Sequence, residues 1–457
     1  MTVCATMPIG HTGHMIPPRK LALLYALFAS LAVLLLASAM PPLQNADEPA
    51  HAFRADQVSY LGLIGVHLYG GSVGGTVDAG LVTESQAVAG LKFNEAAKVS
   101  RDMYRPLAWG PLTTIGFSSA PYPPFFYGPA AVAVAWARHV GTPIPHTLVL
   151  MRLAMSATTI VIATVAIALA DTAAIWLFAV LLLPMSLALT AAITQDGPML
   201  ACTALAVALC GRARNPHTSS RLVFAGLCIL LALVAMARPP YAAFAVLVLM
   251  TRYRLAWRLA GVAGIVLAVG GWSALNIANV VVPHMAAGVV DPHLQMLGIL
   301  WHPLAFMRAM AVTLWRYGPM LAQNFVGTLG WLDTHLPIRY HFVTRAMLLM
   351  AVAAAWLAGT GKPRLLDMAW VVLAVAAACF GLALIQYLTW TVVGAPAIEG
   401  LQGRYFLMPA LILGVILGRP RAAPPPAAAT WLAIPVMAWP IISIAVTMHA
   451  VIARYYF

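Results

Sequence analysis

Charged side chains are scarce in this 457-residue sequence. Asp, Glu, Lys and Arg together make up 9% of it, and only 13 residues are acidic. The five cysteines are scattered without the close spacing typical of a metal or redox centre, which leaves them as small apolar residues. No period of 20–50 residues is found, so nothing indicates a repeat architecture.

Hydrophobic residues, by contrast, make up 62% of the chain, more than a soluble core of this size needs. In a bilayer only helices satisfy their own backbone hydrogen bonds without closing a barrel. The sequence therefore predicts an all-α, polytopic integral membrane bundle. We expect eleven transmembrane helices, at residues 21–40, 147–170, 173–193, 197–211, 222–237, 240–250, 259–282, 342–358, 367–390, 404–418 and 428–449.

Five basic clusters lie between these runs. In a soluble protein the formal net charge of +13 would indicate nucleic-acid binding, but Lys and Arg also collect in cytoplasmic loops of membrane proteins, so we expect no nucleic-acid partner. All five face the cytoplasm if residues 122–141 form a juxtamembrane or re-entrant helix and residues 283–341, including the partly apolar 309–331, stay outside. The clusters are Arg19/Lys20, Arg212/Arg214/Arg221, Arg252/Arg254/Arg258, Lys362/Arg364 and Arg419/Arg421.

This topology predicts a single domain at residues 21–450 of a bacterial inner-membrane protein, after a cytoplasmic tail at residues 1–20. The first apolar run exceeds the usual length in a signal peptide, so we interpret it as a helix, although "ASAM" near its end leaves a cleaved signal as the alternative. Residues 41–146 then form a large extracytoplasmic loop with juxtamembrane helices, and residues 283–341 form a second outer region.

Acidic residues gather in the first outer loop, most densely in "NADEPAHAFRADQVSY", residues 45–60. Pro49 suits the first turn of a helix, which Asp47 or Glu48 can cap. We expect this helix to lie flat on the outer leaflet, with Asp47, His51 and Arg54 on one polar face. At a membrane boundary such a carboxylate can serve as a general base or bind a divalent cation, and capping alone is the alternative.

Two arginines on the predicted outer side break the positive-inside pattern. Arg238 lies in "MARPPY", and Arg404 lies with Tyr405 in "LQGRYFLMP", both at helix ends. A lipid phosphate as ligand would explain both charges, and a snorkelling side chain is the alternative for Arg238. Asp196 in "TQDGP" and Asp333 in "GTLGWLDTHLP" are further candidate substrate-binding residues, with a turn or an interfacial aromatic belt as the alternatives.

Six motifs occur along the chain in this order: "DEPAHAFRADQVS", "YPPFFYGPAA", "TQDGP", "ARPPY", "FVGTLGWLDTHLP" and "LQGRYFLMPAL". Over roughly residues 20–450 they closely resemble the bacterial membrane-protein family called domain of unknown function 2142. More distantly, the layout resembles the GT-C glycosyltransferases, which take a sugar from a polyprenyl-phosphate carrier. That resemblance implies that the acid just after the first helix, Asp47 or Glu48, is catalytic. The large soluble C-terminal domain of some GT-C enzymes has no counterpart.

These observations lead us to expect a GT-C-like glycosyltransferase with an envelope glycan or lipid as acceptor and membrane lipids around it. Asp47, or Glu48 in its place, would be the base, oriented by His51 and Arg54. Arg238 and Arg404 would hold the phosphate of a polyprenyl-linked sugar donor. We expect no resident metal or other cofactor, although a divalent cation is possible. The alternatives are a transporter or flippase of lipid-linked sugars and a subunit of a polysaccharide assembly complex.

The predicted orientation can be tested with single cysteines at Thr83, in the first outer loop, and at Ser219, in a basic loop. An impermeant thiol reagent should label the first but not the second in intact cells, because only residues 41–146 face outward. The reverse pattern would contradict the orientation.

Overall fold

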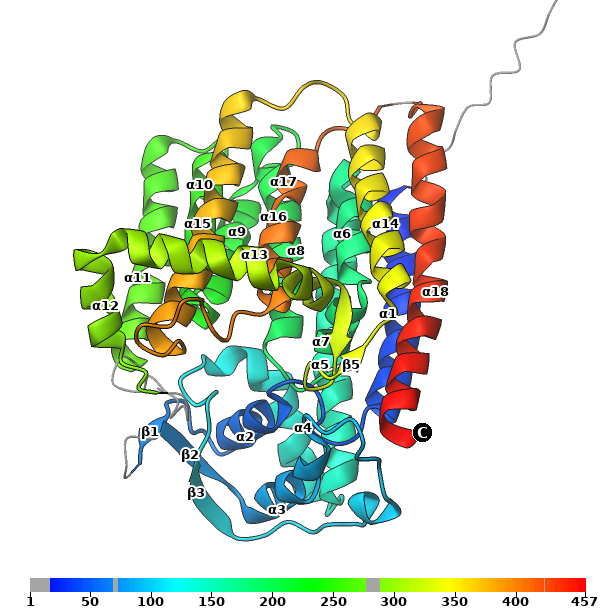
Figure 1. The fold of residues 1–457 in the computed structure, drawn as a ribbon. Helices are drawn as coiled ribbons and strands as arrows, with labels where there is room; N and C mark the ends of the chain where they lie inside the picture. Colours follow the sequence, from blue (N-terminus) through cyan, green and yellow to red (C-terminus); the bar gives the residue numbers. More distant parts are fainter. Residues whose placement is uncertain (1–16, 69–72, 277–287, 423) are drawn as a thin grey trace, which may run out of the picture.

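The computed structural model describes residues 17–68, 73–276, 288–422 and 424–457 (Figure 1). The predicted tail at residues 1–20 therefore lies mostly outside the described residues, as do the ends of the predicted 259–282 span and the start of the 283–341 region. Six described helices are long and apolar enough to cross a membrane: α1 Pro18–Ala39, α5 Ile144–Leu169, α11 Leu255–Asn276, α14 Ile338–Ala358, α15 Leu365–Thr389 and α18 Ala427–Tyr456. The protein is thus a mostly helical membrane protein.

The predicted count of eleven spans is not confirmed. Up to eight spans result if each of two bent helix pairs counts as one span. In the first pair, η5 Asp171–Ala173 and α6 Ala174–Leu181 are followed by α7 Pro184–Thr190 at a bend of 80°. In the second pair, α12 Pro292–Trp301 is followed by α13 Pro303–Gly327 at a bend of 108°. Proline at the first position of α7 and of α13 starts a new helix within a few residues of the end of the preceding one. The remaining bundle helices are shorter or less apolar: α8 Asp196–Arg214, α9 Arg221–Ala237, η6 Pro239–Ala245, α10 Val246–Leu249, η8 Gly403–Phe406, α16 Leu407–Ile412 and α17 Gly414–Leu417.

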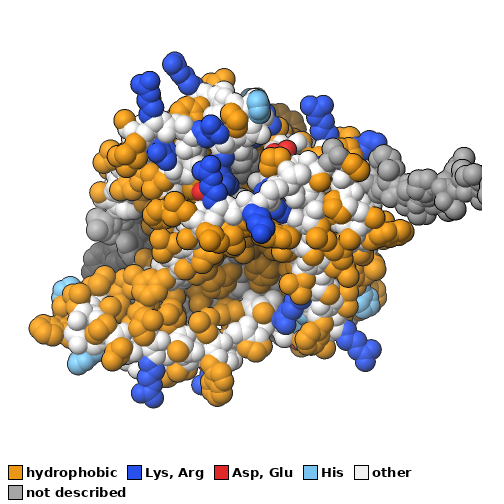
Figure 2. All heavy atoms as spheres, turned by 90° about the horizontal axis from the view of Figure 1, so that it is seen from above, with side chains coloured by type: hydrophobic (Ala, Val, Ile, Leu, Met, Phe, Trp, Pro, Cys, Tyr) orange, Lys and Arg blue, Asp and Glu red, His pale blue; other side chains and the backbone are white. Residues whose placement is uncertain are grey.

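The five basic clusters lie at one end of the bundle, as their spacing predicts. The amide of Arg252 donates to the carbonyl of Ala213 (3.3 Å), and Gly359 forms a β-bridge with Arg421. Arg214 pairs with Asp367 at the same end. Seen from this end, Lys and Arg side chains project around hydrophobic flanks (Figure 2).

A polar layer of short elements covers the other end of the bundle (Figure 1). It contains a three-stranded antiparallel sheet, so the chain is not purely helical. Close strand approach explains a glycine here, because a Cβ on Gly74 would lie 1.7 Å from the carbonyl oxygen of Ile115. The layer comprises α2 Glu48–Ser59, β1 Val66–His67, β2 Val73–Asp78, α3 Ala79–Ala87, η2 Ala89–Leu91, η3 Arg101–Tyr104, β3 Leu112–Gly116, η4 Pro124–Tyr127 and α4 Gly128–His139.

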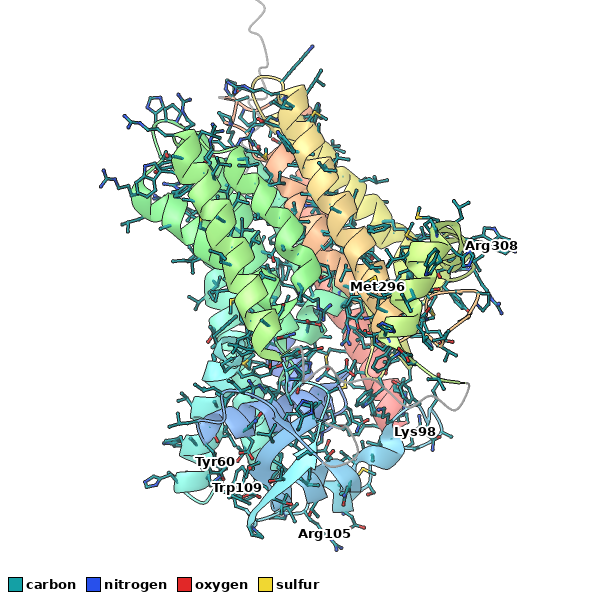
Figure 3. All side chains as sticks on the ribbon, turned by 90° about the vertical axis from the view of Figure 1, so that its left-hand side faces the viewer. Tyr60, Lys98, Arg105, Trp109, Met296 and Arg308 are labelled. Atoms are coloured by element: carbon teal, nitrogen blue, oxygen red, sulfur yellow. The ribbon has the colours of Figure 1, made fainter. Side chains whose placement is uncertain are left out.

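Helix α4, in the segment expected not to cross the membrane, has only 12 residues, about 18 Å, too few to span a bilayer. Helix α2, which we expected to lie flat on the outer leaflet, is instead buried beneath α4 and β2. Asp56 of this helix pairs with Arg138 inside the layer. The guanidinium carbon of Arg138 lies 4.2 Å from the centroid of the Tyr60 ring and 4.8 Å from that of the Trp109 ring, two residues labelled in Figure 3. Because Asp56 finds its partner inside the protein, α2 does not need to expose a polar face to solvent.

The second predicted outer region contains α12, α13 and a short hairpin of β4 Thr328–Leu329 with β5 Thr334–His335. Helix α13 runs across the bundle helices rather than along them (Figure 1). Leu304 and Trp315 on this helix are more than four-fifths exposed, as expected of a helix with one side toward lipid.

Candidate functional site

Asp47 lies at the junction of α1 and α2, where its φ of +62° places it in the left-handed region. Asp tolerates that conformation better than most residues, and such strain often marks functional positions. Its side chain forms no capping hydrogen bond to α2, so the capping alternative does not hold for it. The carboxylate pairs with Arg404, yet the Asp47 side chain stays 44% exposed while that of Arg404 is 3% exposed.

The ion pair keeps Asp47 ionised. Burial would raise the pKa of the Asp47 carboxyl, but the opposed effect of the Arg404 guanidinium prevails and lowers this pKa below its usual value. Asp47 therefore carries a full negative charge that solvent, or a ligand, can reach.

Glu48, the alternative base, is fully buried and fully engaged. Arg152 of α5 donates to both carboxylate oxygens, from Nε to Oε1 (2.8 Å) and from Nη2 to Oε2 (2.6 Å). The amide of Ile193 also donates to Oε1 at 3.0 Å, while the amide and side chain of Asn45 donate to Oε2 at 3.2 and 3.1 Å. Glu48 thus holds the polar layer against the bundle rather than facing a ligand.

His51 lies one helical turn after Asp47, with its ring packed against two tyrosines. Its centroid is 5.8 Å from those of Tyr122 and Tyr127, and its Nδ1 shares a 2.6 Å hydrogen bond with the Tyr127 hydroxyl. Burial lowers the pKa of His51 to about 4, so the imidazole is neutral at pH 7. A neutral imidazole leaves the charge of Asp47 to be balanced by Arg404 and, more weakly, by Lys92.

Arg54 does not contact either candidate base among its described interactions. Its buried guanidinium donates to the carbonyls of Gly62, Leu63 and Tyr122, at 2.6–3.1 Å, and to the side chain of Gln57. It holds the loop after α2 in place, which differs from the predicted role of orienting the base directly.

A second ion pair lies beside the first. Asp196, at the start of α8, accepts a 3.0 Å hydrogen bond from Arg238, at the end of α9. The ring of Tyr405 lies 4.2 Å from the guanidinium carbon of Arg238 and 5.4 Å from that of Arg404. The two arginines are therefore close together, as the sequence predicts, but carboxylates rather than a ligand balance their charges.

Element η8 carries Arg404 into this site because a glycine precedes it. A Cβ on Gly403 would lie 2.0 Å from the carbonyl oxygen of Leu321, so only glycine lets η8 approach α13 so closely. The Nε of Arg404 and both side-chain polar atoms of Gln195 are buried without a hydrogen-bond partner among the described residues. Unpaired buried donors and acceptors are costly, so these atoms are available to a polar ligand.

Asp333 belongs to a different cluster. It is buried and pairs with Arg454, near the end of α18, at 2.9 Å. Its other oxygen accepts the amide of Trp331 (3.2 Å), so its observed contacts hold the β4–β5 turn. None of its described contacts reaches Asp47 or Asp196.

Sequence reasoning missed two basic residues of this region. Arg152 stands alone in an apolar run, and an ionisable residue within a membrane helix is itself a signal of a buried partner. Lys92, in the loop after η2, is exposed, and its charge acts on Asp47. Nothing in its local sequence distinguishes Lys92 from a solvated surface lysine.

An apolar groove of about 520 Å³ lies between α13 and α15, and η8, the element that carries Arg404, contributes Phe406 to its lining. Leu401, just before η8, also lines it. Its other lining residues are Met310, Thr313, Leu314, Leu373, Ala376, Ala377, Cys379, Phe380, Ala383 and Ile398. The groove has the chemistry of a site for a hydrocarbon chain.

The divalent cation that the sequence left possible has no group of ligands among the described residues. Within the described ranges, no three His, Cys, Asp or Glu side chains gather as metal ligands, and the reachable carboxylate, Asp47, is bound by a guanidinium. We therefore derive no step through a metal.

Comparison with known proteins identifies one family. The family model described as "Predicted membrane protein (DUF2142)" matches residues 29–413, which is most of the chain. The matched range includes all of the site residues just described except Arg454. No curated protein and no solved structure matches the chain.

The two adjacent acids should differ in their effect on stability. Glu48→Gln leaves Arg152 buried without a counter-charge and should lower the free energy of unfolding by about 3–5 kcal/mol. Asp47→Asn should lower it less, because the Asp47 side chain is 44% exposed, the amide oxygen of Asn can still accept from Arg404, and Asn tolerates positive φ. Thermal unfolding of the purified variants measures both, and an equal loss of stability would contradict the assignment.

Proposed function

The chain belongs to this family of predicted membrane proteins, and we propose that it is a glycosyltransferase that transfers a sugar from a polyprenyl-phosphate donor to a hydroxyl acceptor. The observation that carries the proposal is Asp47: a reachable, ionised carboxylate, paired with an arginine on η8, which also lines an apolar groove. This arrangement supports a base, a phosphate-binding group and a lipid-binding surface in one region.

The proposed orientation follows from the basic clusters. If their end of the bundle faces the cytoplasm, as the positive-inside rule requires, the polar layer and Asp47 face the outside of the bacterial inner membrane. The acceptor is then an envelope glycan or lipid.

The local charges favour an anionic ligand. Asp47 and Asp196 carry two negative charges, and Arg404, Arg238 and Lys92 carry three positive ones, while His51 is neutral. A phosphate would meet this surplus, and the unpaired Nε of buried Arg404 supplies a donor for it. The prenyl chain of the same molecule would occupy the groove.

The chemistry needs one proton acceptor and a stabilised leaving group. The acceptor hydroxyl gives its proton to Asp47 while its oxygen forms a bond to the anomeric carbon of the sugar. The bond between that carbon and the phosphate oxygen breaks, and its electron pair leaves with polyprenyl phosphate. Arg404 and Arg238 stabilise the developing charge on that oxygen.

Arg404 links donor binding to the strength of the base. While it pairs with Asp47, it lowers the pKa of that carboxyl and makes it a poor proton acceptor. A donor phosphate would compete for the same guanidinium and weaken the pair, so the pKa of Asp47 would rise when substrate is present. The base would become effective only in the complex that reacts.

A transporter of lipid-linked sugars is the principal alternative. Transporters commonly show matched broken helices, with ionisable groups near the middle of the bilayer. Here Asp47, Asp196, Arg238 and Arg404 all lie at ends of helices beside the polar layer, which supports a surface reaction site.

The catalytic role is tested with the purified protein and decaprenyl-phosphate-linked glucose, mannose and galactose as donors, by release of decaprenyl phosphate in the presence of cell-envelope glycan. Asp47→Asn should lower turnover at least about a hundredfold, because an amide accepts no proton. Asp102→Asn is the matched control, an exposed acid of the same loop paired with Arg105, and should stay near wild type. Wild-type turnover by Asp47→Asn would remove the base from the mechanism.

The groove is tested by filling it. Ala377 lines the groove and is exposed there, so Ala377→Trp should raise the KM for a decaprenyl donor about tenfold by removing contact area for the chain. A donor with two isoprene units should be affected much less. Val372→Trp, on an exposed part of α15 outside the groove lining, is the control. An equal change for both donors would show that the chain binds elsewhere.

A further inference from the structure

Arg454, near the end of α18, joins two loops that are far apart in the chain. Its Nη2 donates to the carbonyl of Leu91 (2.8 Å) and to Asp333 (2.9 Å), and its Nη1 donates to the carbonyl of Ala97 (3.1 Å). Lys98, seen beside the end of α18 in Figure 3, donates to the carbonyl of Arg454 at 3.0 Å. The loop after η2 and the β4–β5 turn are thus held together by buried hydrogen bonds.

The turn itself is closely constrained. Gly330 has a φ of +61°, and a Cβ there would lie 2.5 Å from the Tyr455 hydroxyl and 2.6 Å from a carboxylate oxygen of Asp333. Asp333 fixes the backbone of Trp331 by accepting its amide. The contacts of Asp333 therefore hold the backbone of Trp331 in position.

Three side chains meet where the loops join, and we call them the aromatic ledge: Lys92, Phe93 and Trp331. The ammonium of Lys92 lies 3.6 Å from the centroid of the Trp331 ring and 5.1 Å from that of Phe93. The Phe93 and Trp331 rings meet edge to face at 5.7 Å. Phe93 is 67% exposed.

Phe93 is held in an unfavourable conformation. Its φ of +56° is rare for a bulky residue, and the structure directs this aromatic residue outward instead of burying it. One edge of the ring packs on Trp331, and the exposed part of the residue is free to stack on a ligand.

The ledge borders the reaction site and has a polar rim. The side chain of Gln44, three residues before Asp47, donates to the carbonyl of Val88 (3.0 Å), and Tyr455, whose hydroxyl lies beside Gly330, donates to the carbonyl of Gln44 (3.5 Å). Both loops of the ledge are thus tied to the segment that carries the candidate base, and the charge of Lys92 acts on the Asp47 carboxylate. His335 and Glu95, from the same two loops, approach within 3.9 Å, and both are exposed. Ammonium, imidazole and carboxylate groups favour a ring covered with hydroxyls over an acyl chain.

We propose that the aromatic ledge binds a sugar ring of the acceptor, with the apolar C–H face of the sugar on Phe93 and its hydroxyls toward Lys92 and the Glu95–His335 rim. The proposal rests on the proposed function, because it assigns the acceptor of that reaction to the class of glycans. The bound glycan lies next to Asp47, where one of its hydroxyls can lose a proton. Phe93, Trp331 and Lys92 are binding residues and take no part in bond making.

The test is saturation-transfer NMR on the detergent-purified protein without donor. The probes are the methyl glycosides of glucose, galactose, mannose and rhamnose. We expect at least one glycoside to receive saturation at its ring C–H protons, and Phe93→Gly to reduce that signal at least about fivefold. Because glycine accepts positive φ, this variant should melt at or above the wild-type temperature, so the loss is not one of folding. Trp331→Leu should also lose the signal, whereas Trp315→Leu, an exposed tryptophan on α13, should keep it.

The outcomes separate the two proposals. If no glycoside binds the wild type, or if Phe93→Gly binds as well as wild type, the ledge is not a sugar site, whatever the turnover assay shows. If the variants instead lose partition into phosphatidylglycerol vesicles with unchanged glycoside signals, the rings belong to an interfacial belt and the proposal is overturned. Glycoside binding by a wild-type protein that releases no decaprenyl phosphate from any of the three donors would retain the ledge and remove the transferase.

Discussion

The rest of the structure depends on the pairing of buried charges between the polar layer and the bundle. An isolated charge in a nonpolar interior is far more costly than the same charge paired with its opposite. Glu48 and Arg152 satisfy this constraint 104 residues apart, and Asp333 and Arg454 satisfy it 121 residues apart. Each pair requires two segments to meet in one geometry, so the few charges of the chain determine how its loops dock on the helices.

Asp47 is the member of this set that the fold leaves half-exposed. Its neighbour Glu48 has the same chemistry and the opposite environment: all of its oxygens are engaged and none faces solvent. Adjacent carboxylates can therefore be divided between anchoring and reactivity. Because the anchor is rigid, Asp47 is held at the boundary between the polar layer and the lipid-facing groove.

The two arginines near Asp47 show how such a site can be stable and still receive an anion. Each has a carboxylate partner, so the site holds together without a ligand. Each also stacks on Tyr405, which keeps the guanidinium planes in place while leaving some of their donors unused. A phosphate would then redistribute existing interactions, and little structural change would be needed.

The sequence by itself determined the membrane class, the gathering of the basic clusters at one end, and the neighbourhood of Asp47. These features follow from local hydropathy and charge, which a single segment carries whatever it packs against. Other features were decided only by tertiary structure: the burial of α2, the small sheet, the bent helices that reduce the count of spans, and the partners of Asp47, Glu48, Asp56 and Asp333. Arg54 binds carbonyls and Asp333 supports a turn because of segments that fold against them from elsewhere in the chain. Lys92 and Trp331 lie 239 positions apart in the numbering, and no local pattern indicates their contact, because it exists only once Arg454 has joined their loops.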